Sequence, residues 1–240
     1  MKVYAISDLH LSISTPKPMD IFGHIWDNYT DDIEKDWNEK VTDDDIVLLA
    51  GDFSWAMYLE DAVKDYDYLK KLKGRKVMIR GNHDYWWQSI SAVRNSAPSD
   101  MYFLQNDCVR FENILICGTR GWTVPERGRE QTADDLKIYK RELIRLELAL
   151  QSATKLRKEG DILIVMIHYP PFNSAIDDSD FTNLMEKYNA NICVFGHLHG
   201  NKIRSRLEYN KNGIDYYLTS CDKLENKLKF ICSTDATRNE

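Results

Sequence analysis

Residues with metal-ligating side chains occur in five short motifs of this 240-residue chain. In chain order the motifs are Asp8-Leu9-His10, Gly51-Asp52, Gly81-Asn82-His83-Asp84, a single His168, and Gly196-His197-Leu198-His199. Five of the six histidines lie in these motifs. The sixth, His24, falls in a helical pattern, and we expect it to be structural or at the surface. Imidazole together with carboxylate suits Mn, Fe, Zn or Co, whereas calcium prefers oxygen ligands and structural zinc favours thiolates.

The motifs offer more ligands than one tetrahedral ion requires, because they combine carboxylate and amide oxygens with several imidazoles. Shared between two ions that a carboxylate bridges, the same ligands make two sites. Two ions about 3.5–4 Å apart can hold a phosphoryl oxygen, generate hydroxide from water and offset charge in an in-line displacement. The residue types therefore predict a dinuclear centre that acts on phosphate esters.

Each motif follows a short apolar run that is typical of a β-strand. The runs are Val3–Ser7, Ile46–Ala50, Val77–Arg80, Ile162–Ile167 and Ile192–Phe195. They lack an alternation of polar and apolar residues, which indicates strands buried on both faces of a sheet covered by helices. In open α/β sheets, ligands bind outside the carboxyl ends of the strands. The five motifs are therefore expected to converge in space.

Longer amphipathic stretches lie between these strands. Apolar residues recur at helical spacing from Phe22 to Trp37, over Leu59–Leu72, and over about Asp134–Lys158. The last stretch has a suitable N-cap residue in Thr132. Alternation of strands and helices predicts an α/β fold.

Two regions are typical of β-hairpins. Met101–Gly118 predicts a short strand and then a hairpin that turns near Glu112 and Asn113, and Lys202–Cys232 predicts a hairpin through Asn212-Gly213 and a last strand, Leu228–Cys232. The sheet is therefore expected to be mixed, or to be a pair of sheets. Without a linker or repeat, we expect a single domain over residues 1–240, with a frayed tail at 235–240.

Composition excludes several function classes. The net charge of −6 disfavours broad nucleic-acid binding by the surface, although a local basic patch is compatible with it. No apolar run approaches the length of about 18 residues that spans a membrane, and the first residues form a strand pattern rather than a signal peptide. The five cysteines are odd in number and lack C-x-x-C spacing, which favours reduced, buried thiols and a cytoplasmic location.

These motifs, in this order, resemble those of the calcineurin-like metallophosphoesterases, a family marked by D-x-H, G-D, G-N-H-D/E, a lone His after a strand, and G-H-x-H. The segments SDLHLS, GDFSWAM and RGNHDYWW further resemble bacterial predicted phosphohydrolases of unassigned substrate. The resemblance covers residues 8 to 199 and implies a fold of two facing mixed β-sheets flanked by helices. In protein Ser/Thr phosphatases of the superfamily the second motif continues into Val-Asp-Arg-Gly, whereas here Phe53-Ser54-Trp55-Ala56 follows, which argues against a phosphoprotein substrate.

The resemblance also implies roles position by position. Two divalent or trivalent transition-metal ions (Mn, Fe, Zn or Co, with Mn expected in vitro) would be held as follows: Asp8, His10 and His199 on the first, Asn82, His168 and His197 on the second, and Asp52 bridging them. A metal-bridging hydroxide would attack phosphorus. His83 would assist the leaving oxygen, and Asp84 would orient His83.

Aromatic and basic residues near the motifs are candidates for substrate binding. Trp55, Tyr85 and Trp86 could stack on a nucleobase, which stabilises binding by about 1–3 kcal/mol per base, or could pack the motif loops against the scaffold. Among the arginines, Arg120 is best placed to bind phosphate, since it follows a predicted strand. The expected substrate is a phosphorylated small molecule or a nucleotide, as a phosphate mono- or diester.

Two other functions fit the same motifs less well. A non-catalytic metal-binding scaffold on the same fold would be expected to lack a ligand or His83, and all are present. A nuclease acting on long DNA would be expected to carry an added domain or a basic tail, and the chain has neither.

Overall fold

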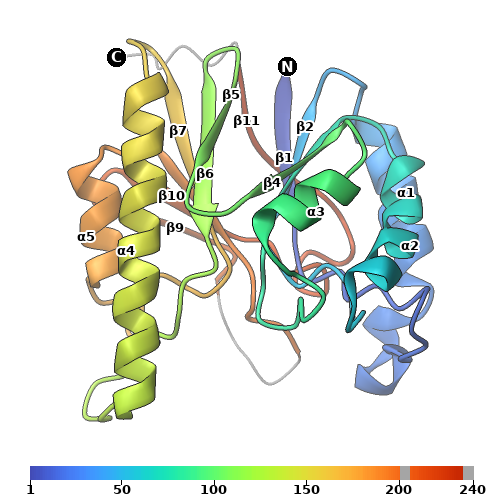
Figure 1. Cartoon of the computed structure of the whole chain (residues 1–240), viewed down its shortest axis with the longest axis horizontal. Helices are drawn as coiled ribbons and strands as arrows, with labels where there is room; N and C mark the ends of the chain where they lie inside the picture. The colour runs from blue at the N-terminus through green and yellow to red at the C-terminus, as the bar shows by residue number, and fades with distance from the viewer. Residues whose placement is uncertain (201–205, 235–240) are drawn as a thin grey trace.

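The computed structural model describes residues 1–200 and 206–234, in which two mixed β-sheets lie face to face between two groups of helices (Figure 1). The first sheet has the strand order β11-β1-β2-β3-β4. Its strands are β1 (Lys2–Ile6), β2 (Ile46–Leu49), β3 (Arg75–Ile79), β4 (Met101–Leu104) and β11 (Lys229–Ser233). The second sheet has the order β5-β6-β7-β8-β10-β9. Its strands are β5 (Cys108–Phe111), β6 (Ile114–Thr119), β7 (Ile162–Ile167), β8 (Ile192–Phe195), β9 (Glu208–Lys211) and β10 (Ile214–Leu218).

The central strands of both sheets are parallel, and the antiparallel strands lie at the edges. In the first sheet β1 to β4 run parallel and β11 pairs antiparallel with β1. In the second sheet β6, β7, β8 and β10 run parallel, while β5 and β9 are antiparallel edge strands. The predicted fold of two facing mixed sheets is therefore confirmed.

The core between the sheets is built by alternate side chains of each strand. Val3 and Leu48 of the first sheet pack in one buried cluster with Ile116, Ile164 and Met166 of the second. Their neighbours along each strand point the other way, to the helices. Both faces of each sheet are thus buried, which explains why the strand sequences are continuously apolar.

Helices cover the two outer faces. The first sheet is covered by α1 (Tyr29–Lys40), α2 (Leu59–Lys70) and α3 (Ile90–Ser96), and the second by α4 (Ala133–Leu156) and α5 (Asp180–Lys187) (Figure 1). Thr132 caps α4 as predicted, because its side chain accepts the N–H of Asp135. The short helices α3 and α5 were not predicted by the apolar pattern.

The helix expected from Phe22 begins later. Residues Asp20–Phe22 and His24–Trp26 form single 3₁₀ turns instead. Gly23 (φ 119°) separates the two turns, and Asn28 (φ 53°) precedes α1. Since the left-handed region cannot continue a right-handed helix, the apolar spacing is interrupted at these two residues.

Both predicted hairpins form, with sharp turns. The turn between β5 and β6 contains Glu112 (φ 51°), and the turn between β9 and β10 has Asn212 (φ 52°) and Gly213 (φ 81°). Two successive left-handed residues are the requirement of a type I′ turn, which suits Asn-Gly. The predicted start of this region at Lys202 and the predicted tail at 235–240 lie outside the described residues.

The parallel strands bring the motif loops to one edge. The motifs follow β1, β2 and β3 of the first sheet and β7 and β8 of the second. No helix in the described ranges is long and apolar enough to cross a membrane. All five cysteines are unpaired, and all except the half-buried Cys108 are buried.

Removal of apolar volume from the core between the sheets is expected to destabilise the protein strongly. Ile164 is completely buried there, and Ile164→Ala should lower the free energy of unfolding by about 2–5 kcal/mol. The matched control is Ile144→Ala on α4, where the side chain is 62% exposed and the change should stay within about 0.5 kcal/mol. Urea unfolding of both variants measures the difference, and equal losses would contradict the assigned core.

Candidate metal centre

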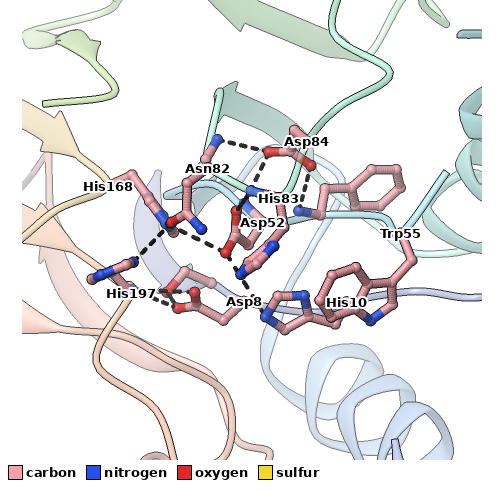
Figure 2. A network of polar contacts seen from close by, with 12 residues as sticks. Asp8, His10, Asp52, Trp55, Asn82, His83, Asp84, His168 and His197 are labelled. Atoms are coloured by element: carbon pink, nitrogen blue, oxygen red, sulfur yellow. Dashed lines mark hydrogen bonds and ion pairs between the residues drawn. The ribbon is translucent and has the colours of Figure 1, made fainter. Parts of the chain in front are cut away.

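Five loops from the two sheets place their polar side chains around one point (Figure 2). One ligand atom from each of Asp8, His10 and His199 lies within 4.8 Å of the others, and the same holds for Asp8, Asp52 and His168. These two groups share Asp8 and span nearly the whole chain. The structure therefore brings together the residues that the sequence places at strand ends.

Asp52 lies at the middle of this cluster and is completely buried. Its Oδ1 accepts a hydrogen bond from the backbone N–H of His83 at 2.7 Å. Its Oδ2 lies 3.4 Å from His168 Nε2 and 3.9 Å from His10 Nε2, and accepts no hydrogen bond within the described part of the chain. One oxygen of this carboxylate thus accepts a hydrogen bond from the backbone, and the other faces the histidines.

Asn82 joins two of the histidines. Its Oδ1 lies 2.8 Å from His168 Nε2 and 2.8 Å from His197 Nδ1. The other nitrogen of His168, Nδ1, lies 2.9 Å from the carbonyl oxygen of Ala50. With Nδ1–H donating to this carbonyl, Nε2 faces the oxygens of Asn82 and Asp52. Such a backbone partner is the usual way in which a ligating histidine is oriented.

His10 has no hydrogen-bond partner for either ring nitrogen among the described residues, although the side chain is buried. Buried polar atoms in folded proteins are almost always bonded. His10 Nε2 and Asp52 Oδ2 therefore face the same space, and neither takes part in a hydrogen bond with a described residue, so both are available as metal ligands. Together with the imidazole–carboxylate donor set, this fits a site for transition-metal ions.

Electrostatics set the charge of each imidazole in the cluster. Burial lowers the pKa of His10 to about 3 and that of His197 to about 3, so both rings are neutral and have a free lone pair. Burial opposes the charged form of His168 as well, but the neighbouring Asp52 carboxylate outweighs it and raises the pKa to about 9. Burial raises the pKa of Asp8, whereas His168 and His10 hold the pKa of Asp52 below its ordinary value against the effect of burial.

Several of these residues have left-handed backbone conformations, which are rare outside glycine. Asp8 (φ 57°), His10 (φ 47°), Asp52 (φ 53°) and His197 (φ 69°) all do. Each such conformation costs on the order of 1 kcal/mol or more and persists where surrounding contacts enforce it. Their concentration at the cluster supports it as a candidate functional site.

Glycine at position 81 allows the loops to approach closely. A Cβ there would lie 2.1 Å from Asp52 Oδ1 and 2.3 Å from the Asp52 nitrogen. Since no rearrangement of flexible atoms could relieve this contact with the backbone, only glycine fits. The motif glycine is thus required by packing against Asp52.

Asp84 does not orient the ring of His83, which corrects the expectation from the sequence. Its Oδ2 accepts the N–H groups of Gly81 (2.7 Å) and Asp52 (2.9 Å). Its Oδ1 accepts those of Phe53 and Ser54 and the indole N–H of Trp86. Burial and the nearby Asp52 carboxylate raise the pKa of Asp84 to about 6, against the donors that favour the anion. Asp84 therefore ties together the loops after β2 and β3.

His83 is half-buried at the open side of the cluster. Its ring centroid lies 4.7 Å from that of Trp55 and 5.6 Å from that of His10. The buried Nδ1 has no partner within the described ranges, and burial lowers the pKa of the ring. The ring is held by aromatic contacts and by its backbone bond to Asp52.

The aromatic candidates for substrate binding differ in accessibility. Trp86 is completely buried, so it cannot contact a substrate, and this expectation is wrong. The chain folds it inward because its N–H serves Asp84 and its ring packs on Phe53 and Phe103. Tyr85 is 51% exposed.

The ring of Trp55 stacks on that of His10, with the two centroids 4.6 Å apart, and Lys17 Nζ lies 3.1 Å from the centroid of the Trp55 ring. It is half-buried, so it both packs a candidate ligand and borders the open side of the cluster. His24, as expected, lies at the surface, where it pairs with Asp27.

Arg120 lies beside the cluster, since its carbonyl accepts the N–H of His168 and of Tyr169. Its side chain lines a cavity with Arg80, Arg141 and Arg145. Neither Arg141 nor Arg145 was singled out from the sequence. Their spacing of four residues on one helix face is the only local signal that they lie together.

Comparisons with known proteins agree with this geometry. The model of the family described as calcineurin-like phosphoesterase matches residues 1–201. Similar solved structures include phosphopantetheinyl hydrolase from Mycobacterium tuberculosis (15% identity, TM-score 0.57, covering 96% of this chain and 95% of that chain). A protein from Thermus thermophilus is 12% identical with a TM-score of 0.59, covering 96% of this chain and 97% of that one. At these identities the likeness shows the fold. No curated protein gives a significant match.

Replacement of the Asp84 carboxylate is expected to loosen both loops. In Asp84→Asn an amide N–H₂ faces backbone donors, and the free energy of unfolding should fall by about 2–4 kcal/mol. The measurement is made at pH 8, above the pKa of Asp84, where the native carboxyl is ionised. The control Asp61→Asn removes only a surface pair with Lys64 and should cost less than about 1 kcal/mol. A similar small loss for both would show that Asp84 does not hold the loops.

Proposed function

Because this chain belongs to the calcineurin-like phosphoesterase family and is a metal-dependent phosphoesterase, we propose that two transition-metal ions bind where the five loops meet and serve the hydrolysis of phosphate mono- or diesters. The observation that carries this proposal is that two buried potential ligand atoms, His10 Nε2 and Asp52 Oδ2, face one space and have no hydrogen-bond partner among the described residues. Mn, Fe, Zn and Co suit the donor set.

In this proposal Asp8, His10 and His199 hold the first ion. The mutual proximity of their ligand atoms supports the assignment. Asn82, His168 and His197 hold the second, which is supported by the convergence of both imidazoles on Asn82 Oδ1. Asp52 bridges, since its free oxygen faces histidines of both sets.

The ions, when bound, would supply a hydroxide at neutral pH and offset the charge of the phosphoryl group. The residues of the chain do the rest. His83 donates a hydrogen bond or a proton to the leaving ester oxygen, and its backbone bond to Asp52 keeps it beside the reacting group. Asp84 acts as a positioning residue, because it holds the loop of Asp52 and the turn that carries His83.

A cavity of about 260 Å³ next to His197 would take the organic part of the substrate. Its wall includes Tyr169, Phe172, Ile176 and Tyr209. Apolar and aromatic walls beside a phosphate site suit a nucleobase or another apolar group. The substrate class we propose is therefore a phosphorylated small molecule, with nucleotides included. Five unpaired cysteines favour a cytoplasmic location.

Loss of the proposed catalytic groups should abolish hydrolysis while the protein stays folded. With Mn present, His83→Ala should lower the rate on an aryl phosphate or its diester by about 10²–10⁴-fold, and Asp52→Asn should bring it to background. His24→Ala, an exposed histidine away from the site, should keep the wild-type rate. Release of the aryl alcohol measures all three, and the two ester types are compared directly.

Folded, metal-loaded wild-type protein that hydrolyses neither ester at any pH would contradict the proposed reaction. Nicking of plasmid DNA without hydrolysis of either small ester would indicate a nuclease instead.

A further inference from the structure

A second cavity, of about 300 Å³, lies beside the proposed metal centre and is lined by four arginines. Arg80 follows β3, Arg120 follows β6, and Arg141 and Arg145 reach it from α4. Gln88 and Gln105 add amide groups to the wall. None of its lining residues is acidic. We call this cavity, with its four arginines, the arginine pocket.

The positive charge of the arginine pocket is only partly balanced. The nearby carboxylate is that of Glu142, which is completely buried. It lies 2.7 Å from Arg145 Nη1, 3.5 Å from Arg141 Nε and 3.6 Å from Arg120 Nη2, and Thr119 donates to it. Three guanidinium groups lie around this carboxylate and Arg80 adds a fourth to the cavity wall, so four positive charges face one negative charge, in a protein whose net charge is −6.

Two of the arginines have unused buried donors. The Nε atoms of Arg80 and Arg120 are buried and bond to no acceptor in residues 1–200 and 206–234. Clustered cations with unsatisfied donors are costly to bury unless an anion is bound. A purely structural ion-pair network would be expected to balance its charges.

The arginine pocket lies next to the loops that carry two candidate ligands. Arg80 stands two residues before the candidate ligand Asn82. The carbonyl of Arg120 accepts the N–H of His168 at 3.0 Å. This proximity is what links the pocket to a substrate at the metal centre.

We propose that the arginine pocket binds a second phosphate group of the substrate, so that preferred substrates carry two phosphates. This rests on the proposed function, in which the first phosphate is hydrolysed at the metal centre. Guanidinium groups bind phosphate oxygens through paired, charge-assisted hydrogen bonds, and several of them around one cavity select for a dianion. The second phosphate fixes the substrate and is not itself cleaved.

The test compares substrates that differ by one phosphate. Mn-loaded wild-type protein is given a nucleoside 3′,5′-bisphosphate and the two corresponding monophosphates, and phosphate release is followed. We expect kcat/KM for the bisphosphate to exceed that for either monophosphate by about tenfold or more, mainly through KM. In Arg141→Gln this preference should fall by about tenfold, because one charge-assisted contact is lost.

Arg141 carries the test, because its side chain is 51% exposed and its loss should leave the fold intact. Arg145→Gln should act in the same direction, although it also removes the closest partner of buried Glu142. The matched control is Lys155→Gln, which removes one exposed positive charge from the same helix, roughly 21 Å beyond Arg141 at 1.5 Å per residue. Its preference should equal that of the wild type.

A wild-type preference near one, or a preference that survives both arginine substitutions, would overturn the proposal. Inhibition of monophosphate hydrolysis by added sulfate that depends on Arg141, without any preference for the bisphosphate, would also overturn it and would indicate a site for free anions. The proposed function fails separately, since in that case the wild type hydrolyses neither the simple aryl phosphate nor its diester.

Discussion

The structure depends on the burial of two carboxylates, Asp8 and Asp52, where the carboxyl ends of the two sheets meet. Buried anions are costly unless cations or hydrogen bonds compensate them. Asp8 accepts hydrogen bonds from Ser7 and His197, whereas one oxygen of Asp52 faces only histidines. Bound cations would stabilise this arrangement and would also draw in the neutral imidazoles. In the proposed function, the same interaction that balances the buried charge would create the reactive centre.

The scaffold enforces this arrangement at a cost to the backbone. Four candidate ligands have positive φ values, and the glycine at position 81 is packed against Asp52. Asp84 compensates part of this cost, since its buried carboxylate accepts hydrogen bonds from backbone N–H groups of two loops. The parallel strands then set the spacing of the loops, and the apolar core between the sheets keeps the strand ends in register. Stability and chemistry are therefore coupled at the same edge of the fold.

The strands and the convergence of the five motifs could be predicted from the sequence, because buried parallel strands are continuously apolar and the motifs follow them directly. Other features depend on contacts between distant residues. The apolar spacing from Phe22 indicated a helix, but left-handed Gly23 and Asn28 delay it until Tyr29. The partner of Asp84 and the burial of Trp86 follow from how the loops after β2 and β3 pack. Arg141 and Arg145 line a common cavity with Arg80 and Arg120 only because the fold places α4 beside the loops after β3 and β6.

The number of ions per chain tests the proposed dinuclear centre most directly. Native mass spectrometry of folded protein, loaded with Mn and then freed of unbound metal, counts them on each molecule. We predict two ions per chain at saturation. A folded chain that saturates with one ion, or that holds none, would contradict it.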